Sequence, residues 1–326
     1  MIKVTFPEKV RLENIDTEND TFSMSFPREI EKLKASIREI GLLTPLILRG
    51  KDANSPLQII SGYKRVIALN ELGIDFVPAH IFKITELDDE QALRLSLLEN
   101  LHSREINCIE ISNFLSKLKE KLNIESEKII EVYLPLLGLA KSLLILNKYL
   151  SLQNLLYGFR ELGIAKKYNV KILSKLSFLS YKDQEPILEL VKKLELGFNL
   201  VNELLTLLEE IAGRDNISIS DLIKGKSINE ILIKDKVSRD QKAELILSFL
   251  KEKRYPHIKE FERKIKNHIK HLNLPDEISV ELPENFEGDS VTMRLKFNNK
   301  EGYRKILDVL IKIFDSEDLK KIMEMI

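Results

Sequence analysis

The sequence predicts an α+β N-terminal domain, then an all-α helical region, and finally a small α+β C-terminal domain. Helical periodicity alternates with short β-prone runs over residues 1–105. Leu and Ile recur at three- and four-residue spacing over residues 106–235, and two strand-like runs between helical stretches mark residues 236–326. We therefore place the three domains at these limits.

Helical spacing, cap residues and β-prone runs define the elements of the N-terminal domain. Pro27 suits the first position of a helix and Gly41 suits its end, because a helix start leaves N–H groups free and glycine tolerates a left-handed backbone. Asp88 or Asp89 can cap the third helix. The expected helices are 27–40, 63–72 and 89–101, and the expected strands are 43–49, 57–60 and 76–82.

Glycines that follow apolar periodic stretches are expected to end helices in the helical region. They are Gly138, Gly163, Gly197 and Gly213. Because no fixed internal period is present, we expect a helical bundle there rather than a solenoid. The C-terminal domain is expected to contain a basic helix over 241–271, strands over 277–282 and 290–297 joined by 283–289, and a last helix over 300–314.

Charge and hydropathy exclude several classes of protein. Lys plus Arg total 51 and Asp plus Glu total 51, so no net charge draws the chain to DNA or to an anionic membrane. The apolar stretches fall short of the roughly 20 residues of a membrane span, and the first residues lack the apolar core of a signal peptide. We therefore expect a cytoplasmic protein without membrane contact. Cys108 has no second cysteine for a disulfide or a zinc knuckle, and is expected to be a small buried side chain.

Two short segments contain the residue types of a phosphate and metal site. At Gly62 the backbone can approach a ligand closely, the following helix start favours an anion, and Lys64 and Arg65 add two cations. Roughly 35 residues later, Glu99 and Asn100 offer the oxygen atoms that Mg²⁺ prefers. Taken separately, each segment also fits a plainer alternative, a solvated helix start and a polar helix end.

The order of three segments resembles the ParB N-terminal domain of the ParB/sulfiredoxin superfamily. Residues 41–49, GLLTPLILR, are similar to the family's GLLQPLVVR segment. Residues 57–69, LQIISGYKRVIAL, are similar to its YELIAGERRxRAA box. Glu99-Asn100-Leu101, with Asn107, Ile109 and Glu110 after it, is similar to its ENLQRxxLNPIE box. The similarity is continuous over about residues 1–112.

The resemblance implies a domain that binds a nucleoside triphosphate, typically CTP, with Mg²⁺, and a homodimer that closes as a clamp on DNA. The implied nucleotide-binding residues are Thr44, Gly62, Tyr63, Lys64, Arg65, Asn100 and Arg104. Glu99 is the implied catalytic residue, and Glu99 with Asn100 would hold the metal.

The boxes also depart from the family's pattern. Tyr63 stands where the family has Glu, and Lys64 where it has the first Arg, so the charge is kept but the bidentate fork is lost. Ser103 stands where the second box has Arg, and Arg104 follows one position later. These changes leave open whether nucleotide is hydrolysed, with a weak CTPase as one outcome. A sulfiredoxin-type reductase is not expected, because the box at 62–65 contains no Cys.

A degenerate helix-turn-helix is expected at residues 126–152, where ParB proteins carry theirs. Its recognition helix would span 139–150, with few polar side chains able to read bases. The candidate DNA-binding residues are Lys141, Ser142, Asn147 and Lys148. The alternative is a core helix of the bundle.

The basic segment 241–271 is a second candidate DNA surface. The segment contains nine Lys and Arg residues and only four Glu, so its cations could contact phosphates without sequence preference. A solvated amphipathic helix fits the same residues equally well. His268 and His271 are three residues apart, but we expect surface histidines rather than a metal site, because no carboxylate and Cys set completes one in the sequence.

The preferred interpretation is a ParB-like, CTP-binding, DNA-associated protein of a chromosome or plasmid partition type. Two alternatives stay open: a nucleotide-dependent kinase or phosphohydrolase on the same fold, and a degenerate module that mediates protein contacts. The sequence also leaves open whether a partner ATPase exists.

Overall fold

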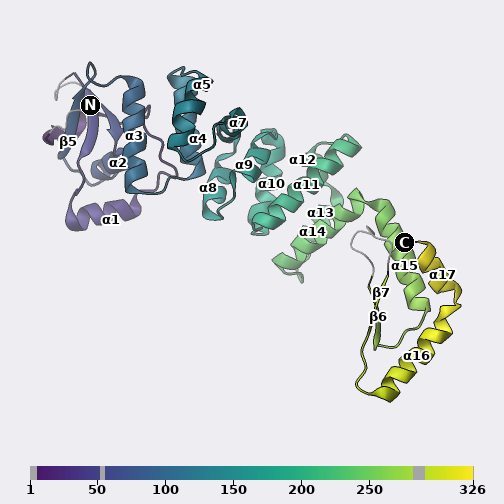
Figure 1. The fold of residues 1–326 in the computed structure, drawn as a ribbon. Helices are drawn as coiled ribbons and strands as arrows, with labels where there is room; N and C mark the ends of the chain where they lie inside the picture. Colours follow the sequence, from purple (N-terminus) through teal and green to yellow (C-terminus); the bar gives the residue numbers. More distant parts are fainter. Residues whose placement is uncertain (1–5, 52–55, 282–290, 326) are drawn as a thin grey trace. The chain divides into compact units, whose positions relative to one another are not determined.

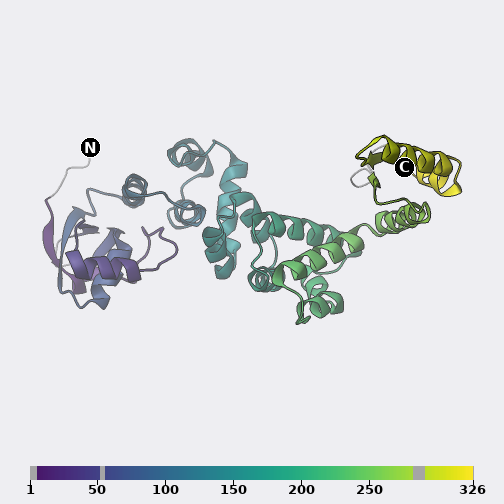
Figure 2. The same cartoon turned by 90° about the horizontal axis from the view of Figure 1, so that it is seen from below.

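The structure, a computed structural model, describes residues 6–51, 56–281 and 291–325, except for the side chains of residues 257–262. Contacts divide the chain into two compact units, residues 1–192 and 193–326. Figures 1 and 2 show the ribbon from two directions. The domain limits near residues 105 and 236 stay predictions, because the contact units group the N-terminal part with the first helices that follow it.

A five-stranded mixed sheet forms the base of the N-terminal unit. Its strands are β1 (Glu8–Arg11), β2 (Ile15–Asp16), β3 (Leu46–Gly50), β4 (Leu57–Ser61) and β5 (Phe76–Lys83). They lie in the order β1-β5-β3-β4-β2, with β3 parallel to β5 and antiparallel to β4. The three expected strands are confirmed. The short edge strands β1 and β2 carry too few residues for an alternating pattern to reveal them.

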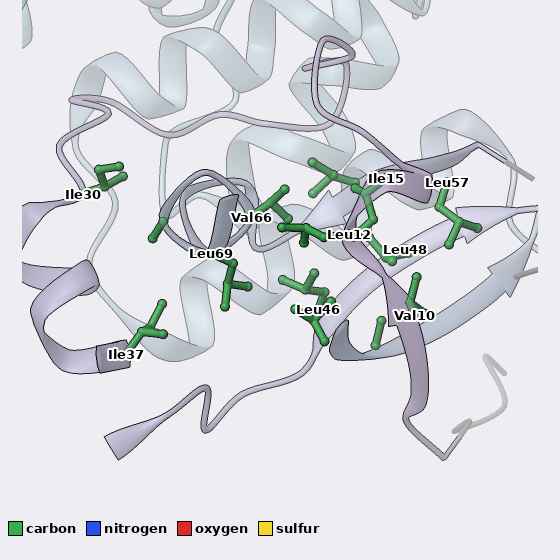
Figure 3. Close-up of a cluster of buried hydrophobic side chains, with 14 residues drawn as sticks. Val10, Leu12, Ile15, Ile30, Ile37, Leu46, Leu48, Leu57, Val66 and Leu69 are labelled. Carbon is green, nitrogen blue, oxygen red and sulfur yellow. The ribbon is translucent and has the colours of Figure 1, made fainter. Parts of the chain in front are cut away.

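Three helices accompany this sheet, α1 (Glu31–Ile40), α2 (Tyr63–Glu71) and α3 (Asp89–Ser103). Side chains of α1 and α2 share one buried apolar cluster with the strands (Figure 3). The first helix begins at Glu31 and not at Pro27, because hydrogen bonds to Asn107 and Glu110 hold the backbone of Phe26 outside a helical path. Asp88 caps α3 through a capping box with Gln91, as expected.

The remainder of the N-terminal unit is helical, as predicted. Its helices are α4 (Cys108–Ser116), α5 (Ser126–Lys128), α6 (Leu134–Leu136), α7 (Leu143–Ser151), α8 (Tyr157–Ala165), α9 (Val170–Ser177) and α10 (Tyr181–Lys193), with π-helical turns at Lys117–Lys121 and Ile129–Tyr133 and a 3-10 turn at Leu152–Asn154. A further 3-10 turn, Leu12–Asn14, joins β1 and β2 of the sheet. Gly138 has a φ of 71° just after α6, which confirms that helix end. Gly163 instead lies inside α8, where a Cβ would come within 2.9 Å of a Leu173 methyl group. It therefore serves close helix packing and not a helix end.

The C-terminal unit begins with helices. They are α11 (Phe198–Asp215), α12 (Ile219–Lys224), α13 (Lys226–Leu232), α14 (Arg239–Arg254) and α15 (Pro256–His271). Gly197 is the N-cap of α11 and does not end α10, whose last residue is Lys193, and Gly213 lies inside α11. That helix ends at Asn216, which has a φ of 52° and belongs to the few residue types that adopt this conformation readily.

The expected basic helix over 241–271 is two helices, α14 and α15. They break at Tyr255, because the residue before a proline is disfavoured in the helical conformation. Strands β6 (Ile278–Glu281) and β7 (Thr292–Leu295) pair antiparallel, and α16 (Lys300–Phe314) confirms the last predicted helix. The predicted connection 283–289, with Leu282 and Ser290 at the strand ends, lies outside the described residues.

One further helix, α17 (Glu317–Glu324), was not expected from the sequence. Every helix in the described ranges is too short or too polar to span a lipid bilayer.

Candidate functional site

The site begins where β4 ends and α2 starts. Gly62 is the N-cap of α2 and has a φ of 102°. A Cβ at this position would lie 2.7 Å from Cδ2 of Leu46 and 3.0 Å from Nε of Arg65. Glycine is therefore required for its backbone conformation and, independently, for space.

Arg65 and Glu99 join the two segments that the sequence singled out. The Arg65 guanidinium donates to the carbonyl oxygens of Thr44 and Pro45, each at 2.9 Å, and lies 3.2 Å from Oε1 of Glu99. The Ser61 hydroxyl donates to Oε2 of the same carboxylate at 2.7 Å. Burial lowers the pKa of Arg65, and the facing Glu99 opposes that shift. The start of α2 and the end of α3 are thus connected through one ion pair.

Lys64 is the least engaged cation of the site. It is half-buried and makes no hydrogen bond or ion pair with any described residue. Burial lowers the pKa of Lys64, the Glu110 carboxylate raises it, and the neighbouring Arg104 lowers it again. A partly desolvated ammonium without an ion-pair partner is well suited to receive an anionic group.

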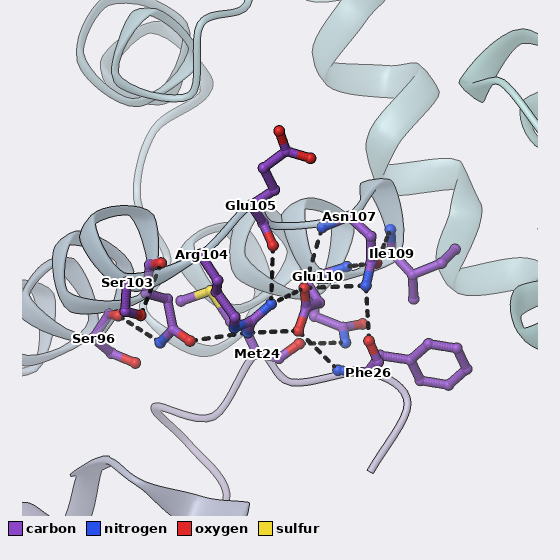
Figure 4. Close-up of polar contacts among 11 residues, drawn as sticks. Met24, Phe26, Ser96, Ser103, Arg104, Glu105, Asn107, Ile109 and Glu110 are labelled. Atoms are coloured by element: carbon purple, nitrogen blue, oxygen red, sulfur yellow. Dashed lines mark hydrogen bonds and ion pairs between the residues drawn. The ribbon is translucent and has the colours of Figure 1, made fainter. Parts of the chain in front are cut away.

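Arg104, in contrast, is held by a buried carboxylate (Figure 4). Its guanidinium makes a bidentate contact with Glu110, at 2.7 and 2.8 Å, and donates to Oδ1 of Asn100 at 2.9 Å. Only 1% of the Glu110 side chain is exposed. Arg104 therefore helps to fix the end of α3 against the start of α4, in addition to its place at the cavity.

Two other predicted residues are also engaged. The amide of Asn100 donates to the Ser96 carbonyl at 2.9 Å, while its oxygen accepts from Arg104. The Tyr63 hydroxyl donates to the Thr17 carbonyl at 3.0 Å, and the Arg28 guanidinium lies 4.8 Å from the centre of the Tyr63 ring. Tyr63 thus fastens the irregular segment before α1 to the start of α2.

A cavity of about 370 Å³ brings all the predicted nucleotide and metal residues together. Those lining it are Thr44, Gly62, Tyr63, Lys64, Arg65, Glu99, Asn100 and Arg104. Its volume lies within the roughly 300–1,000 Å³ typical of ligand pockets. Cavities of about 440 and 550 Å³ also occur in the described part of this unit, so volume alone does not distinguish this cavity. What distinguishes it is that residues of both predicted segments line it together.

The same cavity contains residues that the sequence did not indicate. Ser23, Ser25, Ser61 and Ser96 contribute to its lining. The Ser23 hydroxyl is buried and has no hydrogen-bond partner among the described residues. Ser61 directly precedes Gly62, so its position next to the box was a usable signal, but Ser23 lies in an irregular segment without periodicity.

The candidate DNA-binding residues lie elsewhere in this unit, around α7. That helix begins at Leu143 rather than at residue 139, because Ser142 is extended and forms its N-cap. Lys141 consequently lies in the preceding turn, where it is ion-paired with Glu131. Asn147 is exposed and Lys148 is half-buried.

The first turn of α7 is apolar and accessible. Leu143 is 56% exposed and Leu144 is 64% exposed, whereas Leu146 and Tyr149 are buried. This helix is therefore neither a fully buried core helix nor one that presents a row of polar side chains.

The cations of α14 are largely paired within the C-terminal unit. Lys251 lies 2.6 Å from Glu203, Lys253 lies 3.4 Å from Asp215, and Arg254 lies 2.8 Å from Glu210. All three acidic partners belong to α11. These contacts favour the amphipathic helix alternative over a phosphate-binding surface on α14.

Comparison with known proteins places the N-terminal part in a family. Residues 3–101 match the ParB N-terminal domain. The chain is 31% identical over 124 residues to the chromosome-partitioning protein ParB of Caulobacter vibrioides, covering 38% of this chain and 39% of the relative. It is 25% identical over 178 residues to a probable ParB of Vibrio cholerae, covering 55% and 57%. The matches thus span about two fifths to nearly three fifths of these relatives' length.

Solved ParB structures are similar at lower identity. A C-terminally truncated ParB from Caulobacter crescentus, complexed with CTP-gamma-S, is 22% identical with a TM-score of 0.27, covering 57% of this chain and 98% of that one. The same truncated protein complexed to the centromeric parS site is 19% identical with a TM-score of 0.34, covering 61% and 98%. The assignment rests on the family match and the sequence relatives: residues 3–101 are a ParB N-terminal domain.

Proposed function

We propose that this chain is a ParB-like protein that binds a nucleoside triphosphate in the cavity between Gly62–Arg65 and Glu99–Arg104. CTP is the first candidate for this nucleotide. The observation that carries the proposal is the Arg65–Glu99 contact, which draws the phosphate-type and the metal-type segments to one cavity wall. The Gly62 helix start and Lys64 would receive phosphate oxygens, and Arg65 would add a second cation. Thr44 and Tyr63 would line the nucleotide.

The unsatisfied Ser23 hydroxyl supports a ligand in this cavity. A buried polar group without a partner costs about 1–3 kcal/mol, and a polar ligand atom would remove that cost. Sequence similarity alone would not have pointed to this residue.

The oxygen atoms of Glu99 fit the needs of Mg²⁺ better than those of Asn100. A carboxylate has about four acceptor positions. Glu99 accepts from Ser61 and Arg65, so acceptor positions remain for a metal ion. The Asn100 oxygen already accepts from Arg104. Bound Mg²⁺ would neutralise part of the triphosphate charge, and Glu99 is the residue through which a weak CTPase activity would act.

We further propose that the protein associates with DNA in a partition-type system, as a homodimer that works with a partner ATPase. The relatives described as chromosome-partitioning proteins and the ParB structure complexed to parS support this role. Lys141, Ser142, Asn147 and Lys148 around α7 remain the proposed DNA contacts.

Calorimetric titration with CTP and with ATP, in Mg²⁺, tests nucleotide binding. Lys64→Ala is the sharpest variant, because Lys64 makes no hydrogen bond or ion pair with the described residues and its loss should leave stability intact. Lys83→Ala, at the exposed end of β5, is the matched control. We expect binding that Lys64→Ala weakens at least tenfold and Lys83→Ala leaves unchanged.

Absence of binding by either nucleotide at millimolar concentration would reject the proposal. Product formed from labelled ATP or CTP, abolished by Glu99→Ala in a folded variant, would favour a kinase or a phosphohydrolase instead.

A further inference from the structure

Three metal-ligating side chains meet in the C-terminal unit, remote in sequence from the nucleotide cavity. His268 and His271 share one face of α15, because residues three apart in a helix are neighbours. Asp318, fifty residues after His268, comes from α17. The expectation that no carboxylate and Cys set completes a site with these histidines did not include Asp318. The sequence could not reveal Asp318, because only the packing of α17 on α15 brings it there.

The three groups converge on a small volume. Nδ1 of His268 lies 2.7 Å from Oδ1 of Asp318, and Nδ1 of His271 lies 3.7 Å from the same oxygen. All three ligand atoms lie within 4.8 Å of one another, and no other group of three such residues does so in the described part of the chain. Ligand atoms around a tetrahedral zinc ion are about 3.3 Å apart, which falls between the 2.7 Å and 3.7 Å of these two contacts.

We propose that His268, His271 and Asp318 form a binding site for a divalent transition metal ion, with Zn²⁺ as the ion of first choice. Two imidazoles and one carboxylate suit Zn²⁺, whereas Mg²⁺ and Ca²⁺ prefer oxygen ligands only. His271 is 69% exposed, so an ion enters from solvent and water completes its coordination. The site is independent of the proposed nucleotide site in its residues and its chemistry.

The ion would fasten the last helix to α15. The two helices lie side by side, as Figure 1 shows, around a small apolar cluster whose buried members are Ile265, Leu272, Ile313 and Ile322. Asp318 stands one turn before Ile322, and His268 lies between Ile265 and Leu272 along α15. A small hydrophobic core supplies little stability, so a bound metal ion adds a useful cross-link between the two helices. An ion that binds only the folded state raises the free energy of unfolding by RT ln(1 + [L]/Kd).

The test is titration of the full, EDTA-treated and dialysed chain with ZnCl₂ by calorimetry, with Co²⁺ absorption as a second readout. We expect one ion per chain at micromolar affinity. His271→Gln and Asp318→Asn should each weaken binding at least tenfold. His271→Gln changes an exposed side chain, so its effect is separable from unfolding.

Matched controls are His102→Gln and Asp315→Asn, which remove an exposed histidine and an exposed aspartate outside the cluster. Glu99→Gln tests whether the ion binds at the proposed Mg²⁺ site instead. Zinc should also raise the unfolding temperature of the wild type and the controls, and should raise that of His271→Gln by less. The proposal is overturned if no zinc binds at concentrations about 100 times the expected micromolar Kd. It is also overturned if both cluster variants bind zinc as tightly as the wild type does.

Discussion

Arg65 and Glu99, 34 residues apart in the chain, are joined by a contact of 3.2 Å. Because Arg65 also donates to the carbonyls of Thr44 and Pro45, one guanidinium holds the loop before β3, the start of α2 and the end of α3 together. Any substitution of Arg65 therefore changes the fold of the site as well as its charge. Lys64, without such contacts, reports on ligand binding alone.

Gly62→Ala should lower stability more than Gly73→Ala. Both glycines have positive φ, 102° and 67°, so both variants carry backbone strain of about 1 kcal/mol or more. Only at Gly62 does the new methyl group also collide with Leu46, whereas Gly73 has open space. Urea unfolding followed by circular dichroism measures both, since the chain has no Trp. Equal losses would mean that the contact with Leu46 relaxes freely.

Glu110→Ala should cost more stability than Arg104→Ala. The buried Glu110 accepts five hydrogen bonds, two from Arg104 and three from Phe26 and Asn107. Removing Glu110 leaves several donors unsatisfied, at about 3 kcal/mol or more, whereas removing the half-exposed Arg104 leaves the carboxylate with its other donors, at about 1–2 kcal/mol. The double variant, measured by the same urea unfolding, should be less destabilised than the sum. Additive losses would argue against the observed ion pair.

These two comparisons also mark what the sequence could predict. The capped start of α3, the glycine end of α1 and the helix after Gly62 all follow from residues within four positions of one another. The Arg65–Glu99 pair, the unsatisfied Ser23 and the Asp318 partner of the histidines depend on where distant segments pack. Local spacing records helix faces and caps, but it carries no information on which loop covers a cavity.

The same reasoning explains the wrong helix limits. Gly163 and Gly213 read as stops because glycine is a poor helix former, yet one permits close packing on Leu173 and the other is tolerated inside α11. The segments similar to the family boxes contain residues that meet at one cavity, because such boxes specify residue types at a site and not only periodicity.

Asp20 should make stability depend on acid pH. Burial raises the pKa of Asp20, but Arg28 and Lys117 lower it by more, so the net pKa lies below its ordinary value of 3.8. A carboxyl with a depressed pKa stabilises the folded state above the unfolded pKa, and this contribution is lost as pH falls through the folded pKa. Below about pH 4, the free energy of unfolding should therefore fall more steeply in the wild type than in Asp20→Asn. Unfolding at pH 5, 4 and 3 checks this, with the exposed Asp75→Asn as control. Parallel curves for wild type and Asp20→Asn would contradict the prediction.

DNA association through α7, as proposed above, should be weakened by substitutions in that helix and not by substitutions in α14. Asn147→Ala and Lys148→Ala should weaken retention on DNA, and loss of one phosphate contact should reduce the salt dependence of log K by about one. The double variant Lys251→Gln, Lys253→Gln should leave DNA retention unchanged, because both lysines are already paired with α11. It should cost only about 0.2–1 kcal/mol of stability per exposed pair.

Filter binding at several salt concentrations, with and without CTP, distinguishes the two surfaces. The reverse outcome would transfer the interface to the C-terminal unit. Because the exposed Leu143 and Leu144 occupy the first turn of α7, from which a recognition helix usually reads bases, we expect DNA contacts at α7 to be mainly with the phosphate backbone.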